Sequence, residues 1–179
     1  MTLLEIKKKT LQLIEEISDN ANLTDDPDIK SKLNSVINQV QFELARMKKI
    51  PAYMELEVEE GQVVDMNTLD NFYQLRLLRF CGSFELVENL ATFNEDGKAV
   101  FYYYKYPEAI KDDTPDTYEF ELSQDALEIL PYGVASDLLK SDVSTNYGAI
   151  YSQRYEIMLQ RLDPRYSMAS FTIEGGVDI

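Results

Sequence analysis

The stretch 48–60 reads KKIPAYMELEVEE, and within it the spacing of the apolar residues changes. After Pro51, the apolar residues Met54, Leu56 and Val58 alternate with glutamates. A two-residue repeat of this kind predicts a β-strand with one face toward solvent. The chain is therefore expected to leave a helical region here and to enter a sheet.

Two helices are predicted before this point. The first, near residues 3–19, follows Thr2 and Glu5, which have the spacing of a capping box. The second begins at Asp26 and Pro27, an N-cap followed by proline at the first helical position. The apolar face of the first helix comprises Leu3, Ile6, Leu13, Ile14 and Ile17. That of the second comprises Ile29, Leu33, Val36, Ile37, Val40, Leu44 and Met47.

Strand patterns continue through the middle of the chain. Residues 72–80 and 99–106 are rich in aromatic and branched residues, and apolar residues alternate with polar ones over 117–122. Residues 94–97 read Asn-Glu-Asp-Gly and predict a hairpin turn, because glycine accepts a positive φ at little cost. Residues 111–116 predict a polar loop. Together these segments predict one small antiparallel sheet.

Helical spacing returns at Ser123. Because Pro131 lacks a backbone donor, we expect a short turn followed by a helix from Pro131 to about Lys140. A last helix, capped by Asp142 or Ser144, ends at Asp163-Pro164. The apolar face of the 123–140 segment comprises Leu127, Leu130, Val134, Leu138 and Leu139. That of the last helix comprises Tyr147, Tyr151, Tyr155, Met158 and Leu162, with Ile150 and Leu159 at its edge.

The sequence thus predicts an α+β fold: an antiparallel helical bundle of two N-terminal and two C-terminal helices, with a small antiparallel β-sheet inserted. The expected parts are an N-terminal helical pair (1–52), a β-sheet region (53–122) and a C-terminal helical pair packing on the first (123–166). An extended C-terminal tail (167–179) follows.

Composition limits the possible functions. The 179 residues include 17 Lys or Arg and 32 Asp or Glu, a formal net charge of −15, which opposes sequence-independent binding to nucleic acid. The chain has no His and one Cys, so it can form neither a His-based catalytic site nor an intrachain disulfide. Neither an export signal nor an apolar run of about 18 residues is present. We therefore expect a soluble, unexported protein.

No catalytic, cofactor or metal site is predicted. The acidic groups at Asp25, Asp26 and Asp28, and at Asp112, Asp113 and Asp116, favour helix capping and a solvated loop over cation binding. The tyrosines at 102–104 favour core packing over a sugar-stacking platform. Cys81 is expected to be buried and inert. A carboxylate-dependent enzyme is the least favoured class, since no pair of carboxylates is singled out by spacing.

Two segments suggest protein contacts. Tyrosine tolerates partial exposure, so the ridge of Tyr147, Tyr151 and Tyr155 suits an interface, although a core face is favoured. Phe171 and Ile173 are too few to form a core within the tail, and such a segment either frays or docks on a neighbour by strand addition.

The stretch LEILPYGVASDLLKSD at 127–142, together with the helix at 147–162, resembles the head-to-tail connector (adaptor or neck) proteins of tailed bacteriophages and prophages. The resemblance rests on a Leu-Pro-Tyr, Ala and Leu-Leu pattern before a helix of the Tyr-x-x-x-Tyr-x-x-x-Leu kind. It covers about the last 50 residues at motif level; the rest agrees only in layout.

This resemblance implies a non-enzymatic virion protein that forms a homo-oligomeric ring below the portal and connects the head to the tail. Its partners would be the portal and a tail or stopper protein, with DNA passing through the channel without specific binding and no membrane involved. It would occupy the bacterial cytoplasm during assembly and then the virion. Expected subunit or portal contacts are Tyr147, Tyr151, Arg154, Tyr155, Phe171 and Ile173. The alternative is a carbohydrate- or peptide-binding module that uses the tyrosine-rich sheet.

Overall fold

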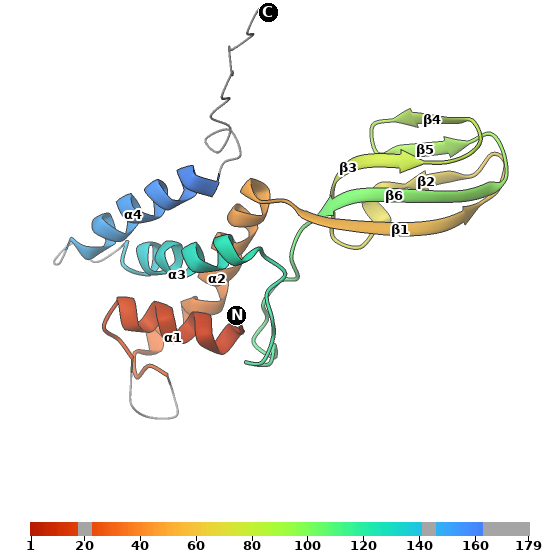
Figure 1. Ribbon diagram of the computed structural model, residues 1–179. Coiled ribbons are helices and arrows are strands. Elements are labelled where there is room, and N and C mark those ends of the chain that lie inside the picture. The colour runs from red at the N-terminus through yellow and green to blue at the C-terminus, as the bar shows by residue number, and fades with distance from the viewer. Residues whose placement is uncertain (18–22, 141–145, 163–179) are drawn as a thin grey trace, which may run out of the picture.

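The computed structural model describes residues 1–17, 23–140 and 146–162. Over these residues the fold is α+β: two N-terminal and two C-terminal helices pack together, and two antiparallel three-stranded sheets lie between them in the sequence (Figure 1). The fold class predicted from the sequence is confirmed, with two small sheets where one was expected.

Helix α1 (Leu3–Leu13) begins with the predicted capping box, in which the Thr2 side chain accepts from the Glu5 N–H and the Glu5 carboxylate accepts from the Thr2 N–H. It ends earlier than the predicted residue 19, because Glu15 takes a left-handed φ of 59°. The buried face is Leu3, Ile6, Thr10 and Leu11, and Ile17 is exposed. The predicted apolar face at 13, 14 and 17 was therefore wrong.

Helix α2 (Pro27–Met47) matches the prediction more closely. The Asp26 carboxylate accepts from the N–H groups of Asp28 and Ile29, and Pro27 occupies the first helical position. The predicted stripe is buried at Leu33, Ile37, Val40 and Leu44, whereas Met47 is exposed at the last turn.

Helix α3 (Gln124–Leu138) runs without interruption through Pro131, so the predicted break at this residue was wrong. The proline removes the N–H that would bond the Leu127 carbonyl, which costs about 3 kcal/mol in an isolated helix. Burial offsets this cost, since Pro131 and most of its neighbours from Ala126 to Ala135 are buried.

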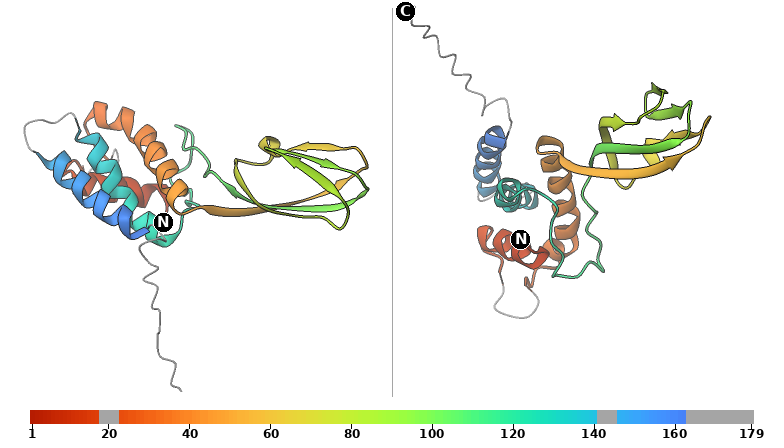
Figure 2. Two further views of the ribbon diagram at one scale, coloured as in Figure 1. Left: turned by 90° about the horizontal axis from the view of Figure 1, so that it is seen from above. Right: turned by 45° about the vertical axis from the view of Figure 1, so that its right-hand side comes forward.

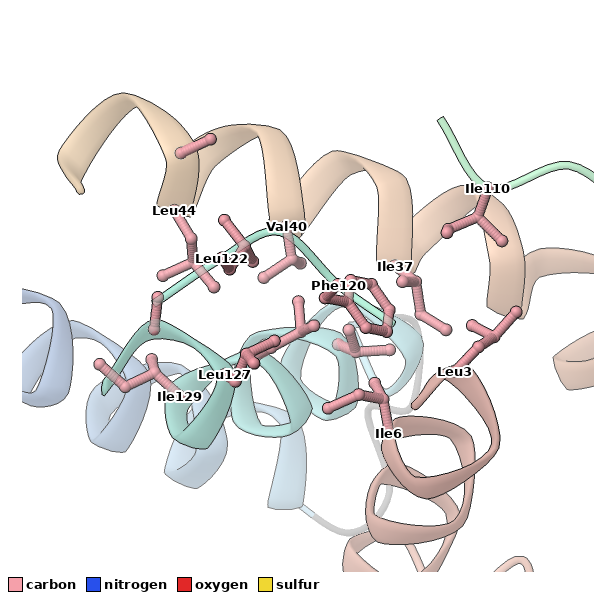
Figure 3. Packing of buried hydrophobic residues seen from close by; sticks show 14 of the residues in the cluster. Leu3, Ile6, Ile37, Val40, Leu44, Ile110, Phe120, Leu122, Leu127 and Ile129 are labelled. Atoms are coloured by element: carbon pink, nitrogen blue, oxygen red, sulfur yellow. The ribbon is translucent and has the colours of Figure 1, made fainter. Parts of the chain in front are cut away.

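Helix α4 (Tyr147–Leu162) packs mainly against α3. Figure 3 shows the core of the helical part, where Ile6 from α1, Val40 and Leu44 from α2, and Leu127 from α3 converge. The predicted caps at Asp142 and Ser144, the stop at Asp163-Pro164 and the tail lie outside the described residues.

The first sheet has the order β1-β6-β3, and the second has the order β2-β5-β4. A second core, separate from that of the helices, lies between them and includes Phe93, Phe101 and Tyr103. The short 3₁₀ helix η1 (Met66–Thr68) follows β2. The strands are β1 (Ile50–Val58), β2 (Val63–Asp65), β3 (Phe72–Arg79), β4 (Phe84–Val87), β5 (Leu90–Phe93) and β6 (Gly97–Lys105).

The turn at 94–97 does not close a hairpin, contrary to the prediction. Strand β5 pairs with β2 and β4, whereas β6 pairs with β1 and β3. The turn therefore carries the chain from one sheet to the other.

Residues 117–122 form no strand beyond an isolated bridge between Thr2 and Glu119, so the predicted last strand was wrong. Phe120 and Leu122 are buried in the helical core instead. Alternation arises here because an extended segment lies on the helices with every second side chain inward. The predicted sheet region 53–122 thus divides near Tyr106: residues 50–105 carry the sheets and the following link packs on the helices.

The sheets extend away from the helices, connected by β1 directly after α2 and by the chain that leaves β6 (Figures 1 and 2). No helix in the described ranges is long and apolar enough to cross a membrane.

Candidate interaction surfaces

The acidic groups singled out in the sequence serve local structure. Asp28 pairs with Lys32 at 2.6 Å, and Asp116 pairs with Lys7 at 3.0 Å. Asp112 accepts a long bond of 3.4 Å from Asn34. Within residues 1–17, 23–140 and 146–162, no group of three or more acidic or Cys side chains is arranged to hold a metal ion.

Cys81 is exposed, so its predicted burial was wrong. Strand β3 ends at Arg79, and the ring of Phe80 is the one that turns inward to pack against Phe93 at 4.9 Å between ring centroids. The thiol is left in the turn between β3 and β4.

The three consecutive tyrosines of β6 lie on two faces of the first sheet. Tyr103 faces the core with 3% of its surface exposed, and this burial raises the pKa of its hydroxyl. Tyr102 and Tyr104 lie on the opposite, outer face. Only these two of the three are placed to meet a ligand or a partner.

Cations cover the tyrosines of this outer face. The Arg79 guanidinium lies 5.3 Å from the ring centroid of Tyr102, and the Lys49 ammonium lies 4.9 Å from that of Tyr104. Arg46, near the end of α2, lies 5.9 Å from the ring centroid of Tyr106. The tyrosine–cation face is defined here by these six residues: Arg46, Lys49, Arg79, Tyr102, Tyr104 and Tyr106.

Two exposed apolar side chains extend this face along the sheet. Tyr53 on β1 is 67% exposed, with its ring centroid 6.3 Å from that of Tyr102. Leu77 on β3 pairs with Tyr102 from the other side and is 45% exposed. The result is an aromatic surface bordered by positive charge rather than an open, uncharged platform.

The tyrosine ridge of α4 is divided between core and surface. Tyr155 is buried, and its hydroxyl donates to Glu43 Oε2 at 2.8 Å. Burial, and next the bond to Glu43, raises the pKa of Tyr155 far above its usual range. Tyr151 is half-buried and donates to the Leu13 carbonyl. These two residues join α4 to the rest of the helical part, which agrees with the favoured core interpretation.

The neighbouring face of α4 carries a second apolar stripe. Tyr147, Ile150 and Ile157 are 51%, 55% and 47% exposed. With Arg154, which lies over the ring of Tyr132 at 4.6 Å, they have the spacing i, i+3, i+7 and i+10 of one helical face. We call these four residues the outer stripe of α4. Tyr147 also borders a hollow between α1 and α4 that Leu13, Ile14, Leu139 and Tyr151 line with it.

Of the α4 residues predicted at contacts, Tyr147 and Arg154 are on the surface, whereas Tyr151 is half-buried and Tyr155 is buried. Ile150 was predicted only at the edge of the core face and Ile157 was not predicted, although both fit the same helical spacing as Tyr147. Phe171 and Ile173, also expected at contacts, lie outside the described residues.

Comparison of the sequence with known protein families and with curated proteins found no match.

Proposed function

We propose that the chain is a structural, non-enzymatic protein of a tailed phage or prophage virion, which forms a ring below the portal and connects the head to the tail. The observation that carries this proposal is the outer stripe of α4. The stripe lies in the same segment, 127–162, that resembles the connector family.

An uncovered stripe of this kind suits a protein contact. Large apolar side chains are scattered singly on most monomers, whereas three on one helical face with an arginine resemble the composition of interface cores. Tyr147, Ile150 and Ile157 are each about half exposed, so a partner could remove substantial apolar surface from water.

The charge of the chain is compatible with this role. A channel lined by a protein of net charge −15 repels DNA and avoids phosphate contacts that would slow its passage. The proposed partners are other copies of the chain, the portal and a tail or stopper protein. Contacts between copies that are weak in solution are expected to strengthen on the portal, which acts as a template.

The test is binding to the portal protein encoded in the same genome. We expect the wild-type chain to sediment with portal rings and to form a ring visible by electron microscopy. Replacing Ile150 and Ile157 by Ser should weaken this association at least about tenfold, because the contact loses its apolar side chains.

The matched control replaces Leu86 and Val87 of β4 by Ser. These two residues are also exposed, at 45% and 64%, but lie on the second sheet. Circular dichroism should show both variants folded. Equal portal binding by wild type and the α4 variant would contradict the role of the stripe. Absence of portal binding by the wild-type chain would contradict the proposed function.

A second test concerns the tail. Deleting residues 167–179 should abolish docking to the adjoining component while the thermal unfolding temperature stays unchanged. A truncated chain that unfolds, or one that docks as well as the full chain, would count against the proposal.

The runner-up function, a carbohydrate- or peptide-binding module, is favoured by one observation: Tyr53 is largely exposed beside Tyr102. Calorimetric titration against a glycan panel would detect it. Tyr53→Ala should then abolish the binding heat, whereas Phe84→Ala, outside this face, should leave it.

A further inference from the structure

The charges of the two sheets are separated along their length. The turn after β1 and the turn before β6 lie at the end of the sheets far from the helices (Figure 1). Five exposed acidic residues lie on β1 and on these two turns. We call this set the acidic tip; it comprises Glu57, Glu59, Glu60, Glu95 and Asp96. At the end next to α2 lie Arg46 and Lys49 of the tyrosine–cation face.

Hydrogen bonds hold the acidic tip together. The Glu60 N–H donates to Asp96 Oδ1 at 2.6 Å, which joins the turn after β1 to the turn before β6. Glu95 Oε1 accepts from the N–H and the hydroxyl of Ser83, at 3.2 and 3.1 Å, in the turn before β4. Lys98, near the start of β6, forms an ion pair with Glu55 at 2.5 Å. Lys98 also lies directly opposite Glu57 and partly neutralises it, so the tip is an ordered surface of net negative charge.

The tyrosine–cation face is an ordered surface of positive charge. Within the described residues, Arg46, Lys49 and Arg79 form no ion pair with a carboxylate, although the chain has 32 acidic residues. Lys49 instead donates to Gln74 Oε1 at 2.7 Å and lies over aromatic rings, as does Arg79. Cations placed over rings keep their charge available to a partner.

Arg46 and Lys49 cannot reach the acidic tip of their own chain, whereas Arg79, which pairs with Val100, lies nearer the tip. Tyr53, which pairs with Tyr102, precedes Glu59 by six residues on the same extended segment. At the rise of a β-strand this separates the tip from the centre of the tyrosine–cation face by about 20 Å. A carboxylate partner for Arg46 and Lys49 is therefore expected from another molecule.

We infer that the acidic tip of one copy of this chain docks on the tyrosine–cation face of a second copy. This occupant is favoured because the chain itself carries both complementary surfaces. The part of the inference that places the contact in a ring rests on the proposed function.

The symmetry of such a contact suits a ring. Two different patches of the same chain join, so the contact is head-to-tail and leaves a free tip and a free face on every pair. Repetition either closes a ring or grows a filament, whereas a self-complementary patch would stop at a dimer. The outer stripe of α4 is then left for the portal.

Cys81 provides a probe of this contact in the native sequence. It is the single cysteine of the chain, and it is exposed in the turn between β3 and β4. Ser83, two residues later, bonds Glu95 of the tip. We would label it with benzophenone maleimide, mix labelled chains with ¹⁵N-labelled chains, irradiate and identify the linked peptides by mass spectrometry. The mixture distinguishes links between copies from links within one copy.

The expected links join Cys81 of one copy to peptides containing Lys49 or Tyr53 of another. Their yield should fall severalfold between 50 and 500 mM salt, because screening weakens charged contacts (about 10 Å Debye length at 0.1 M). Links spread over the whole surface, links only within one chain, or links concentrated on α4 would overturn the inference.

Charge exchange provides the decisive control. Arg46→Glu with Lys49→Glu, or Glu59→Lys with Glu60→Lys, should each reduce the yield at least about tenfold. Mixing the two variants should restore it, since each tip then meets a face of opposite charge. Lys8→Glu with Lys30→Glu changes the net charge as much as the first variant and should leave the yield unchanged. Reduction by the control, or no restoration in the mixture, would overturn the inference.

These results separate the inference from the proposed function. Portal binding that persists while the Cys81 links fail would remove the sheet contact and leave the connector proposal. If the Cys81 links respond to the charge-exchange variants as expected but the chain does not bind the portal, the connector proposal would be wrong and the contact between copies would stand.

Discussion

The ring of Tyr155 fills the space that a side chain at Gly133 would need. A Cβ at Gly133 would lie 2.7 Å from Cε2 of Tyr155 and 2.7 Å from Cγ1 of Val40. Helices α2, α3 and α4 therefore meet at a single glycine, and their close approach sets where α4 lies and which of its faces is outward.

We predict that Gly133→Ala destabilises the fold by about 1–3 kcal/mol, the usual cost of overpacking a core. Alanine favours a helix over glycine by about 1 kcal/mol, so the sign of the effect shows whether the three helices can separate. Urea unfolding followed by circular dichroism measures it.

Glu128→Ala, at an exposed position of the same helix, controls for a change of side chain on α3. It should alter the free energy of unfolding by less than about 0.5 kcal/mol. A Gly133→Ala variant more stable than wild type would contradict the close packing described here.

A second prediction concerns alkaline pH. Burial and the bond to Glu43 keep Tyr155 protonated in the folded state, whereas in the unfolded chain its pKa is near 10.0. Above pH 10 the unfolded state loses a proton that the folded state keeps, so the free energy of unfolding falls as pH rises. Below pH 10 this contribution is fully present. In Tyr155→Phe the fall between pH 9 and 11 should be smaller than in wild type.

The same variant should lose about 1 kcal/mol at pH 7, because the hydroxyl no longer donates to Glu43. Tyr53→Phe removes a hydroxyl from an exposed ring and should leave stability at pH 7 unchanged. Tyr118→Phe provides a comparison at high pH, since burial raises the pKa of Tyr118 to about 12. A Tyr155→Phe variant with the wild-type alkaline slope would show that Tyr155 ionises freely.

A third prediction concerns the link between the sheets and α3. Asn38 on α2 accepts from the Ile110 N–H and donates to the Ile110 carbonyl, both at 2.6 Å. Gln41 donates to the Glu108 carbonyl at 2.9 Å. Asn38→Ala should cost about 2–3 kcal/mol, because two hydrogen bonds are lost and two backbone groups are left without partners. The Ile110 amide should exchange with deuterium at least about tenfold faster.

Asn34, about one turn earlier on α2, is the matched control. Its bond to Asp112 is long, at 3.4 Å, so Asn34→Ala should cost less than about 0.5 kcal/mol. Equal effects of the two variants on the free energy of unfolding would show that Asn38 does not hold the link on α2.

Local patterns predicted the parts of the fold that local chemistry determines. The Thr2 capping box and Asp26 with Pro27 fix both N-terminal helix starts, and the alternation around Leu56 identifies β1. In each case the residues that determine the element are close together in the sequence. They are a capping side chain and the N–H groups that it bonds, or the alternating apolar and charged side chains of a strand.

The predictions were wrong where contacts between residues far apart in the sequence determine the structure. Pro131 remains helical because its neighbours are buried against α1, α2 and α4. Phe120 alternates like a strand residue but packs on the helices, and no property of residues 94–97 reveals that β5 and β6 belong to different sheets. The tyrosine–cation face likewise depends on the approach of Arg79 from β3 and Lys49 from the end of α2, which the sequence does not place together.

The separation of the two cores leads to the last prediction, that the sheets can be removed without unfolding the helices. Pro51 and Tyr104 are paired neighbours on β1 and β6, so their Cα atoms lie about 5 Å apart. Replacing residues 52–103 by Asn-Gly should close a two-residue hairpin between them. The buried residues of the helical core, including Ile50, are all retained. Circular dichroism should show helix and cooperative thermal unfolding.

This shortened chain also separates the two proposed contacts. It lacks the acidic tip and Arg79, so it should not associate with other copies, but it keeps the outer stripe of α4 and should still compete with wild type for the portal. The shortened chain carrying Ile150→Ser and Ile157→Ser is the control and should not compete. A shortened chain without cooperative unfolding would show that the helical core depends on the sheets, and the two parts could not then be regarded as independent modules.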